Sequence, residues 1–199
     1  MDLEVGGSSP LSHPKECLVY YTKDMKKILL DGNEVKTLVP ENLPMLIHGK
    51  EGSGASLYTI CLAAKWFSQG YKVLFLCGHQ MAEQEFRQQV SIEQTSAKFY
   101  TQDKVNEFIE ELRDVTRNTI VIIKNIELFD IKLFDAIRDV GNLIISGEID
   151  KTVLKGQLLS KKFVTEVYFS PLNSKEVPQL ERFQGYVISD DYKGTTQLQ

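Results

Sequence analysis

The segment from Gly49 to Ser56, GKEGSGAS, has the spacing of a phosphate-binding loop but lacks its lysine. The functional pattern is G-x-x-x-x-G-K-[ST], in which backbone N–H groups cradle the phosphates and the lysine neutralises their negative charge. Gly49 and Gly54 match the two glycines, and Ser56 matches the hydroxyl that faces Mg²⁺. Ala55 stands in place of the lysine. We therefore expect the shape of a nucleotide site without the cation that phosphoryl transfer requires.

Weak phosphate binding by the remaining groups of this loop is compatible with the sequence. Backbone N–H groups at a helix N-terminus attract anions without any side chain. Residual nucleotide contacts are therefore predicted at six positions: Gly49, Lys50, Gly52, Ser53, Gly54 and Ser56. The alternative interpretation is a glycine-rich turn that only joins a strand to a helix.

The surrounding sequence supplies the strand and the helix that must position the loop. Residues 43–48 form an apolar run typical of a buried strand, and residues 57–69 carry apolar side chains over a broad helical surface. Further strands are predicted at 71–77, 97–101, 119–123 and 142–146, and helices at 81–90, 103–117 and 131–140. We expect a three-layer α/β fold with a mostly parallel central sheet, closed by a C-terminal strand pair at 165–170 and 183–189.

The chain is predicted to hold one domain between two short ends. Residues 1–15 are rich in Gly, Ser and Pro and predict a flexible N-terminal tail. Residues 16–194 are assigned to the domain, and residues 195–199 to a frayed C-terminus. Within the domain, residues 22–30 predict a short helix that ends at the turn Asp31-Gly32-Asn33.

Composition and charge exclude several classes of protein. The net charge of −4 excludes a diffuse basic surface for nucleic acid. Cys17, Cys61 and Cys77 lack C-x-x-C spacing, so we predict reduced thiols, no metal site and a nuclear or cytoplasmic location. No apolar stretch approaches transmembrane length, so no membrane association is expected.

Two further segments resemble the RecA-like family of P-loop ATPases, which includes replicative helicases and strand-exchange recombinases. Val73–Phe86, VLFLCGHQMAEQEF, resembles the strand and turn that carry the catalytic glutamate of helicase-type members. Ile120–Leu128, IVIIKNIEL, resembles the Walker B strand. Together with the loop, the resemblance covers roughly residues 43–147. It implies a RecA-like P-loop fold.

Alignment with that family places residues of other types at the positions of its catalytic and metal-binding residues. The catalytic glutamate falls on His79, which is either a base or a solvent-facing loop residue. The aspartate that serves Mg²⁺ falls on Lys124, and Glu127 comes too late and is expected to face solvent or cap a loop. Ala55, His79 and Lys124 together imply a pseudo-ATPase without catalytic residues. A lysine placed like Lys50 reaches a partner's phosphates in deviant loops of partitioning ATPases, but those loops keep the second lysine, so Lys50 is interpreted as a variable loop residue.

The small size and the runs 73–76, 97–113 and 119–129 are most like the Shu-type recombinase paralogues, which are small accessory subunits. This resemblance implies a non-catalytic subunit that pairs with another RecA-like paralogue and assists recombinase filaments on single-stranded DNA in homologous recombination. It requires no cofactor, although weak ATP or ADP binding, or a nucleotide shared with the partner, is compatible with it. Two alternatives stay open: a RecA-like scaffold subunit of an Elongator-type tRNA-modification complex, and a weak nucleotide-binding P-loop protein.

Two short segments are candidates for contacts in such a complex. One lies where recombinases carry the strand that docks on a neighbour, with an edge strand of the chain's own sheet as the alternative. The docking residues predicted there are Cys17, Leu18, Val19, Tyr20 and Tyr21. The other is the only basic cluster, predicted to lie near DNA, with a solvated face as the alternative. Its residues are Lys151, Lys155, Lys161 and Lys162.

Overall fold

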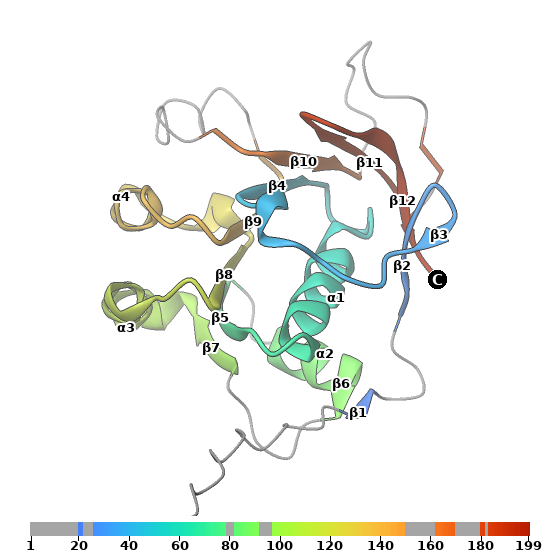
Figure 1. Ribbon diagram of the computed structural model, residues 1–199. Coiled ribbons are helices and arrows are strands. Elements are labelled where there is room, and N and C mark those ends of the chain that lie inside the picture. Colours follow the sequence, from blue (N-terminus) through green and yellow to red (C-terminus); the bar gives the residue numbers. More distant parts are fainter. Residues whose placement is uncertain are drawn as a thin grey trace, which may run out of the picture.

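The computed structural model describes residues 20–21, 26–78, 82–91, 97–149, 162–169, 180–181 and 183–199. A ten-stranded mixed sheet forms the centre of this described part (Figure 1). Six neighbouring strands are parallel, in the spatial order β10 (Thr165–Tyr168), β4 (Met45–His48), β9 (Leu143–Gly147), β8 (Thr119–Lys124), β5 (Lys72–Cys77) and β7 (Ala97–Thr101). β4, β8 and β9 are buried at every residue, as expected for parallel strands covered on both faces. The prediction of an α/β fold with a mostly parallel sheet is confirmed.

Helices cover both faces of the parallel strands and give the expected three layers (Figure 1). α1 (Ala55–Ser68) and α2 (Ala82–Gln89) lie on one face, and α3 (Val105–Glu111) and α4 (Ile131–Ile137) lie on the other. Side chains of β8 alternate between the two cores, because successive residues of a strand point to opposite faces. Ile120 and Ile122 join the core under α1, whereas Val121 and Ile123 join the core under α3 and α4. None of the helices in the described ranges combines the length and apolar character that crossing a bilayer needs.

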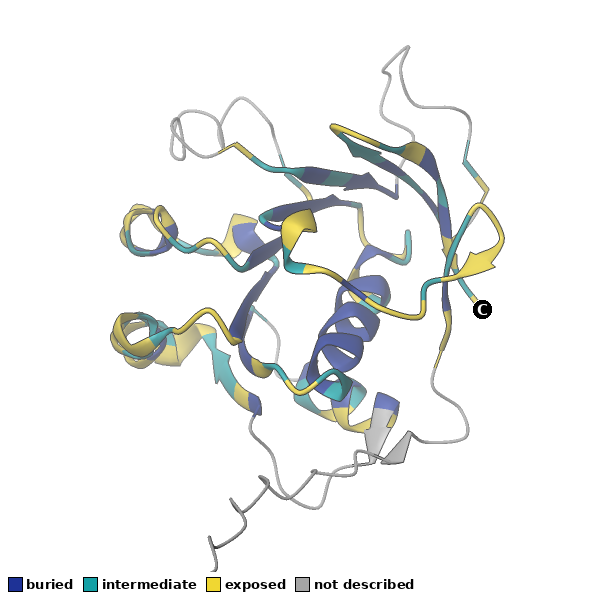
Figure 2. Cartoon of the chain, in the orientation of Figure 1, coloured by how far each residue is buried: buried dark blue, intermediate teal, exposed yellow. Residues whose placement is uncertain are grey.

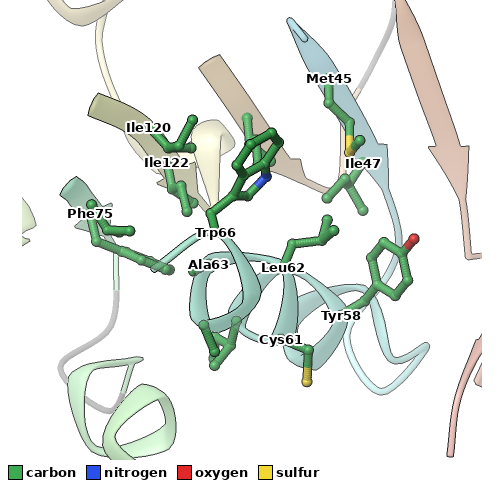
Figure 3. Close-up of a cluster of buried hydrophobic side chains, with 14 of the residues drawn as sticks. Met45, Ile47, Tyr58, Cys61, Leu62, Ala63, Trp66, Phe75, Ile120 and Ile122 are labelled. Atoms are coloured by element: carbon green, nitrogen blue, oxygen red, sulfur yellow. The ribbon is translucent and has the colours of Figure 1, made fainter. Parts of the chain in front are cut away.

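Helix α1 is buried almost all the way around its axis (Figure 2). One side packs on the parallel sheet, where Leu62 and Trp66 lie against Ile47 and Ile120 (Figure 3). Another side carries Tyr58, whose hydroxyl is 3.1 Å from the Thr196 hydroxyl. A helix that is apolar all round must be covered on every side. The sheet provides that cover by continuing past β10 and curling over α1 (Figure 1).

The continuation of the sheet is antiparallel and includes strands that the sequence did not suggest. β11 (Gln184–Ser189) follows β10, and then come β12 (Lys193–Leu198), β2 (Ile28–Leu30) and β3 (Asn33–Glu34). The predicted pair at 165–170 and 183–189 corresponds to β10 and β11, which are paired as expected. The frayed end at 195–199 was a wrong prediction, because residues 195–198 belong to β12, which pairs with β11 and β2, and Gln199 exchanges backbone hydrogen bonds with Lys27. The helix at 22–30 was also wrong, because β2 occupies its second part.

Two other segments differ from expectation or fall partly outside the described residues. The helix expected at 103–117 is shorter, because α3 is flanked by 3-10 turns at Gln102–Lys104 and Leu112–Asp114. Two more 3-10 turns are Pro40–Asn42 and Ile126–Leu128. β1 (Tyr20–Tyr21) pairs antiparallel with β6 (Val90–Ser91) in a separate two-stranded sheet. The expected tail at 1–15 lies outside the described residues.

A carboxylate in the turn between β2 and β3 ties β12 to this edge of the sheet. Asp31 accepts hydrogen bonds from the Tyr192 hydroxyl at 2.6 Å, the Thr195 N–H at 2.8 Å and the Thr195 hydroxyl at 3.0 Å. The Tyr192 hydroxyl first, and then the Thr195 N–H, hold the pKa of Asp31 below its usual value. The ionised form is therefore the one that the folded chain favours.

We predict that Asp31→Asn lowers the thermal midpoint by a few degrees at neutral pH. Because the folded pKa of Asp31 is depressed, its contribution is present above the unfolded pKa of about 3.9 and is lost as the pH falls through the folded value. The difference between variant and parent should therefore shrink below about pH 4. Thermal melts between pH 3 and 7 measure it, with the exposed Asp191→Asn as matched control. An equal effect of both changes would contradict a specific role for Asp31.

Candidate functional site

An open cleft of about 730 Å³ lies at the carboxyl ends of β4, β8 and β9. Their ends are aligned by register, because His48 pairs with Gly147 and Lys124 pairs with Ser146. The chain passes from β4 to β5, which is three positions away in the sheet, and β8 and β9 later fill the two positions between them. Such reversals of strand order leave a crevice at the carboxyl edge, where α/β proteins bind their ligands.

The glycine loop forms one wall of the cleft and is held by backbone contacts. The Gly49 N–H donates to the Gly147 carbonyl at 3.1 Å, and the Ser53 N–H donates to the Lys50 carbonyl at 3.1 Å. A Cβ on Gly49 would collide with the side chain of Ala55 and lie 2.6 Å from Ser53 Oγ. The first glycine therefore allows the loop to fold back closely on the start of α1.

The second glycine of the motif starts α1 in a left-handed conformation. Gly54 has φ of 101°, and a Cβ there would lie 2.9 Å from Cδ1 of Phe183. Gly52 also has a positive φ, of 75°. Ala55 is the first residue of α1 and lines the cleft, so the wall where the motif places a cation carries only a methyl group.

Lys124 ends β8 and belongs to the lining of the cleft, although its side chain is only 9% exposed. It shares a strand face with Ile122, which places it on the α1 side of the sheet. Its Nζ lies 3.7 Å from Oε2 of Glu85 on α2, a distance that makes an ion pair but no direct hydrogen bond. The ammonium therefore connects β8 to α2 across the cleft and stands where the Walker B pattern places a metal-binding carboxylate.

The turn after β8 brings a second carboxylate to the cleft. Asn125 has φ of 60°, a left-handed conformation that asparagine tolerates, and its side-chain amide donates to Oε1 of Glu127 at 3.4 Å. The Glu127 carboxylate occupies the space beside Gly147 that a Cβ would fill. Glu127 is exposed, as expected from its position in the sequence, and it also lines the cleft.

The sequence matches no protein-family model and no curated protein, but solved structures resemble the fold. TcpA, the conjugation coupling protein of pCW3 with ATPγS, is similar over 88% of this chain with a TM-score of 0.58 and 13% identity. Thermomonospora curvata EccC (ATPases 2 and 3), in complex with a signal sequence peptide, is similar over 87% with a TM-score of 0.57 and 10% identity. The cytoplasmic domain of EssC is similar over 86% with a TM-score of 0.59 and 11% identity.

The chain has the fold of P-loop ATPase domains. Identities of 10–13% show the fold alone. This chain spans 66% of the TcpA chain, and 40% and 43% of the EccC and EssC chains. The expected relation to P-loop ATPases is thus confirmed at the level of the fold, and the narrower relation to recombinase paralogues stays a prediction.

Most of the predicted loop residues gather in the cleft of this P-loop ATPase fold. Those that line it are Gly49, Lys50, Gly52, Ala55 and Ser56, while Ser53 and Gly54 shape the loop behind them. Lys124 joins them from β8. His79 lies outside the described residues, so its predicted place at the catalytic position stays a prediction.

The predicted docking and DNA-proximal residues are described only in part. Of the docking segment, Tyr20 and Tyr21 pair through their backbones with β6 of the same chain, while Cys17, Leu18 and Val19 lie outside the described residues. Of the basic cluster only Lys162 is described, and its Nζ lies 2.9 Å from Oδ2 of Asp190. That hydrogen bond raises the pKa of Lys162 and already engages its charge. Lys151, Lys155 and Lys161 lie outside the described residues.

Several acidic residues of the cleft escaped sequence analysis. The cleft is lined by two cations, Lys50 and Lys124, and by four carboxylates, Glu51, Glu85, Glu127 and Glu148, which gives 2 − 4 = −2. Glu148 lies two residues after the predicted strand at 142–146, so the sequence offered a signal for its position at the carboxyl edge of the sheet. Glu85 gave none, because its position depends on how α2 packs against the carboxyl edge of the sheet.

We predict that removing the two partners of the Lys124–Glu85 pair has unequal effects on stability. Glu85→Gln leaves the buried ammonium without its partner and should reduce the free energy of unfolding by roughly 1 kcal/mol, less than for a fully buried pair because Glu85 is 38% exposed. Lys124→Met removes the buried charge and keeps the volume, so the change should be close to zero or stabilising. Urea unfolding measures both, with the exposed Glu110→Gln as control. A larger loss for Lys124→Met would show that the lysine makes contacts beyond this pair.

Proposed function

We propose that this chain is a non-catalytic P-loop subunit whose role is to hold a complex together. The observation that carries the proposal is the chemistry of the cleft. Ala55 lines it at the lysine position, and Lys124 lines it at the metal position with its charge already engaged by Glu85. Phosphoryl transfer depends almost entirely on positioning and on cationic stabilisation of the phosphates. The lysine and the metal-binding aspartate that would meet these two requirements are both absent from this cleft.

The overall charge of the cleft supports the same conclusion. A nucleoside triphosphate brings several negative charges, and a lining of −2 opposes them at short range. A bound Mg²⁺ offsets such repulsion in ATPases, but Lys124 places a like charge where the metal would sit. The remaining attraction comes from Lys50 and from backbone N–H groups at the start of α1. We infer that any nucleotide binding is weak and that no cofactor is required.

For the biological setting, the sequence resemblance favours a recombinase-paralogue complex. The resembling run 73–76 lies in β5, the run 97–113 covers β7 and α3, and the run 119–129 covers β8. β8, β5 and β7 are neighbours at one end of the parallel part of the sheet. In this proposal the chain pairs with another RecA-like paralogue in the nucleus or cytoplasm. The complex then assists recombinase filaments on single-stranded DNA. The scaffold subunit of an Elongator-type complex and the weak nucleotide-binding P-loop protein remain the alternatives.

The sheet offers a surface for such assembly at its outer parallel strand. β7 ends the sheet, with β5 on one side and no further strand among the described residues on the other. An edge strand with unpaired backbone groups is a template for a strand from another chain. Lys98 on this strand forms an ion pair with Glu111 at 2.6 Å, and such edge charges limit unspecific pairing.

We predict that the purified chain has no ATPase activity of its own. Turnover with Mg²⁺, with or without single-stranded DNA, should stay far below the order of 1 s⁻¹ that is typical of enzymes. The Lys50→Ala variant serves as a control for the deviant-loop interpretation. A substantial rate that Lys50→Ala abolishes would overturn the proposal and assign Lys50 a catalytic role.

The proposal also predicts that the chain has a stable protein partner. Affinity purification of the tagged chain from its own cells, followed by mass spectrometry, should recover a second RecA-like subunit in stoichiometric amount. Recovery of Elongator subunits instead would select the alternative complex. A chain that purifies without any stoichiometric partner, and behaves as a stable monomer, would contradict the scaffold role in both settings.

A further inference from the structure

Three of the four carboxylates in the cleft form no ion pair with another described residue. Glu85 is engaged with Lys124, but Glu51, Glu127 and Glu148 take part in no ion pair within the described ranges. All three are exposed at the cleft. Like charges that line one cavity repel each other, so a cation that enters the cavity gains free energy from this negative potential.

A buried hydroxyl supplies a second and independent observation. Ser146 on β9 lines the cleft and is only 2% exposed, yet its Oγ has no hydrogen-bond partner in the described structure. It shares a strand face with Ile144, so it lies on the same side of the sheet as Lys124 and the glycine loop. Buried polar atoms are normally hydrogen-bonded, so the Ser146 hydroxyl can donate a hydrogen bond to, or accept one from, a water or a polar group that enters the cleft.

The arrangement of the acceptors favours an organic cation over a metal ion. No three His, Cys, Asp or Glu side chains among the described residues lie close enough together to hold a metal ion. Acceptors that are spread along a cleft suit a guanidinium group, which presents five N–H donors in a planar fork and stays charged at any physiological pH. Its long stem also reaches into a cleft from a neighbouring surface.

We propose that this cleft accepts an arginine side chain of the partner protein in place of a nucleotide. The guanidinium would lie between Glu127 and Glu148 and donate to Ser146 Oγ, while Lys124 keeps Glu85 as its own partner. The inference rests on the proposed scaffold function, because it names a place where the partner chain enters. It also gives the glycine loop a new role as one wall of a protein-binding pocket.

The test uses an acetylated and amidated tetra-arginine peptide, titrated calorimetrically into the full chain at physiological ionic strength. Glu127→Gln with Glu148→Gln should weaken binding at least about tenfold, which corresponds to roughly 1.4 kcal/mol. Glu107→Gln with Glu110→Gln on α3 changes the net charge equally outside the cleft and should leave affinity nearly unchanged. Ser146→Ala should weaken binding by about fivefold, since one hydrogen bond is worth roughly 1 kcal/mol. Unchanged thermal midpoints confirm that the variants are folded.

Four results would overturn the inference. Equal losses from the cleft pair and the α3 pair would show diffuse attraction to an acidic surface. Equally tight binding of a tetra-lysine peptide would remove the argument for a guanidinium. If ATP with Mg²⁺, or Mg²⁺ alone, binds more tightly than the peptide and displaces it, the cleft is a nucleotide or metal site. Recovery of the natural partner by the cleft double variant as efficiently as by the parent would also refute the arginine pocket, while leaving the scaffold function intact.

Discussion

Burial of helix α1 between two parts of one sheet is the constraint on which the other features of this domain depend. Eleven of its fourteen residues are buried, including the polar Thr59 and Lys65, and the parallel strands can cover only one side. The antiparallel strands β11, β12 and β2 have to curl over the opposite side, where the Tyr58 hydroxyl meets Thr196. Burial of that phenol raises its pKa to about 12, so it stays neutral. The strands near the two ends of the described domain, β2 at one end and β11 and β12 at the other, therefore serve to cover helix α1.

Fixing α1 in this way also fixes the glycine loop, because the loop leads directly into the helix. The Gly49–Gly147 hydrogen bond attaches the start of the loop to β9, and Phe183 packs against Gly54 at its end. Both contacts are made within the chain and neither involves a phosphate. These contacts can therefore hold the shape of the loop without a bound phosphate. Retention of the shape is consequently no argument for nucleotide binding.

The elements that could be predicted from the sequence are those whose burial is set by local pattern. The runs MLI in β4 and IVII in β8 are apolar at every position and predict buried central strands, and the strand, loop and helix around Gly49 followed from the motif. β12, with the sequence KGTTQL, carries little apolar signal, because its pairing with β2 is decided by contacts more than 160 positions apart. The loop residues and Lys124 were found for the same reason, since they follow strands with clear patterns. Glu85 and Ser146 were missed because their function depends on neighbours that only the tertiary fold assembles.

Lys124 at the end of β8 shows how one residue can affect the charge of such a cleft without altering the backbone around it. An aspartate at this position contacts phosphates only through a metal ion. Without it, the other charges in the cleft determine whether an anion can bind. Lys124 alters this balance by taking up Glu85, and the carboxylates that remain on the loop and after β8 and β9 then determine the sign of the cavity. The backbone of the loop attracts anions, whereas its rim attracts cations. At short range the full charges of the side chains outweigh the partial charges of a helix end, which supports the proposal that a positive group enters the cleft.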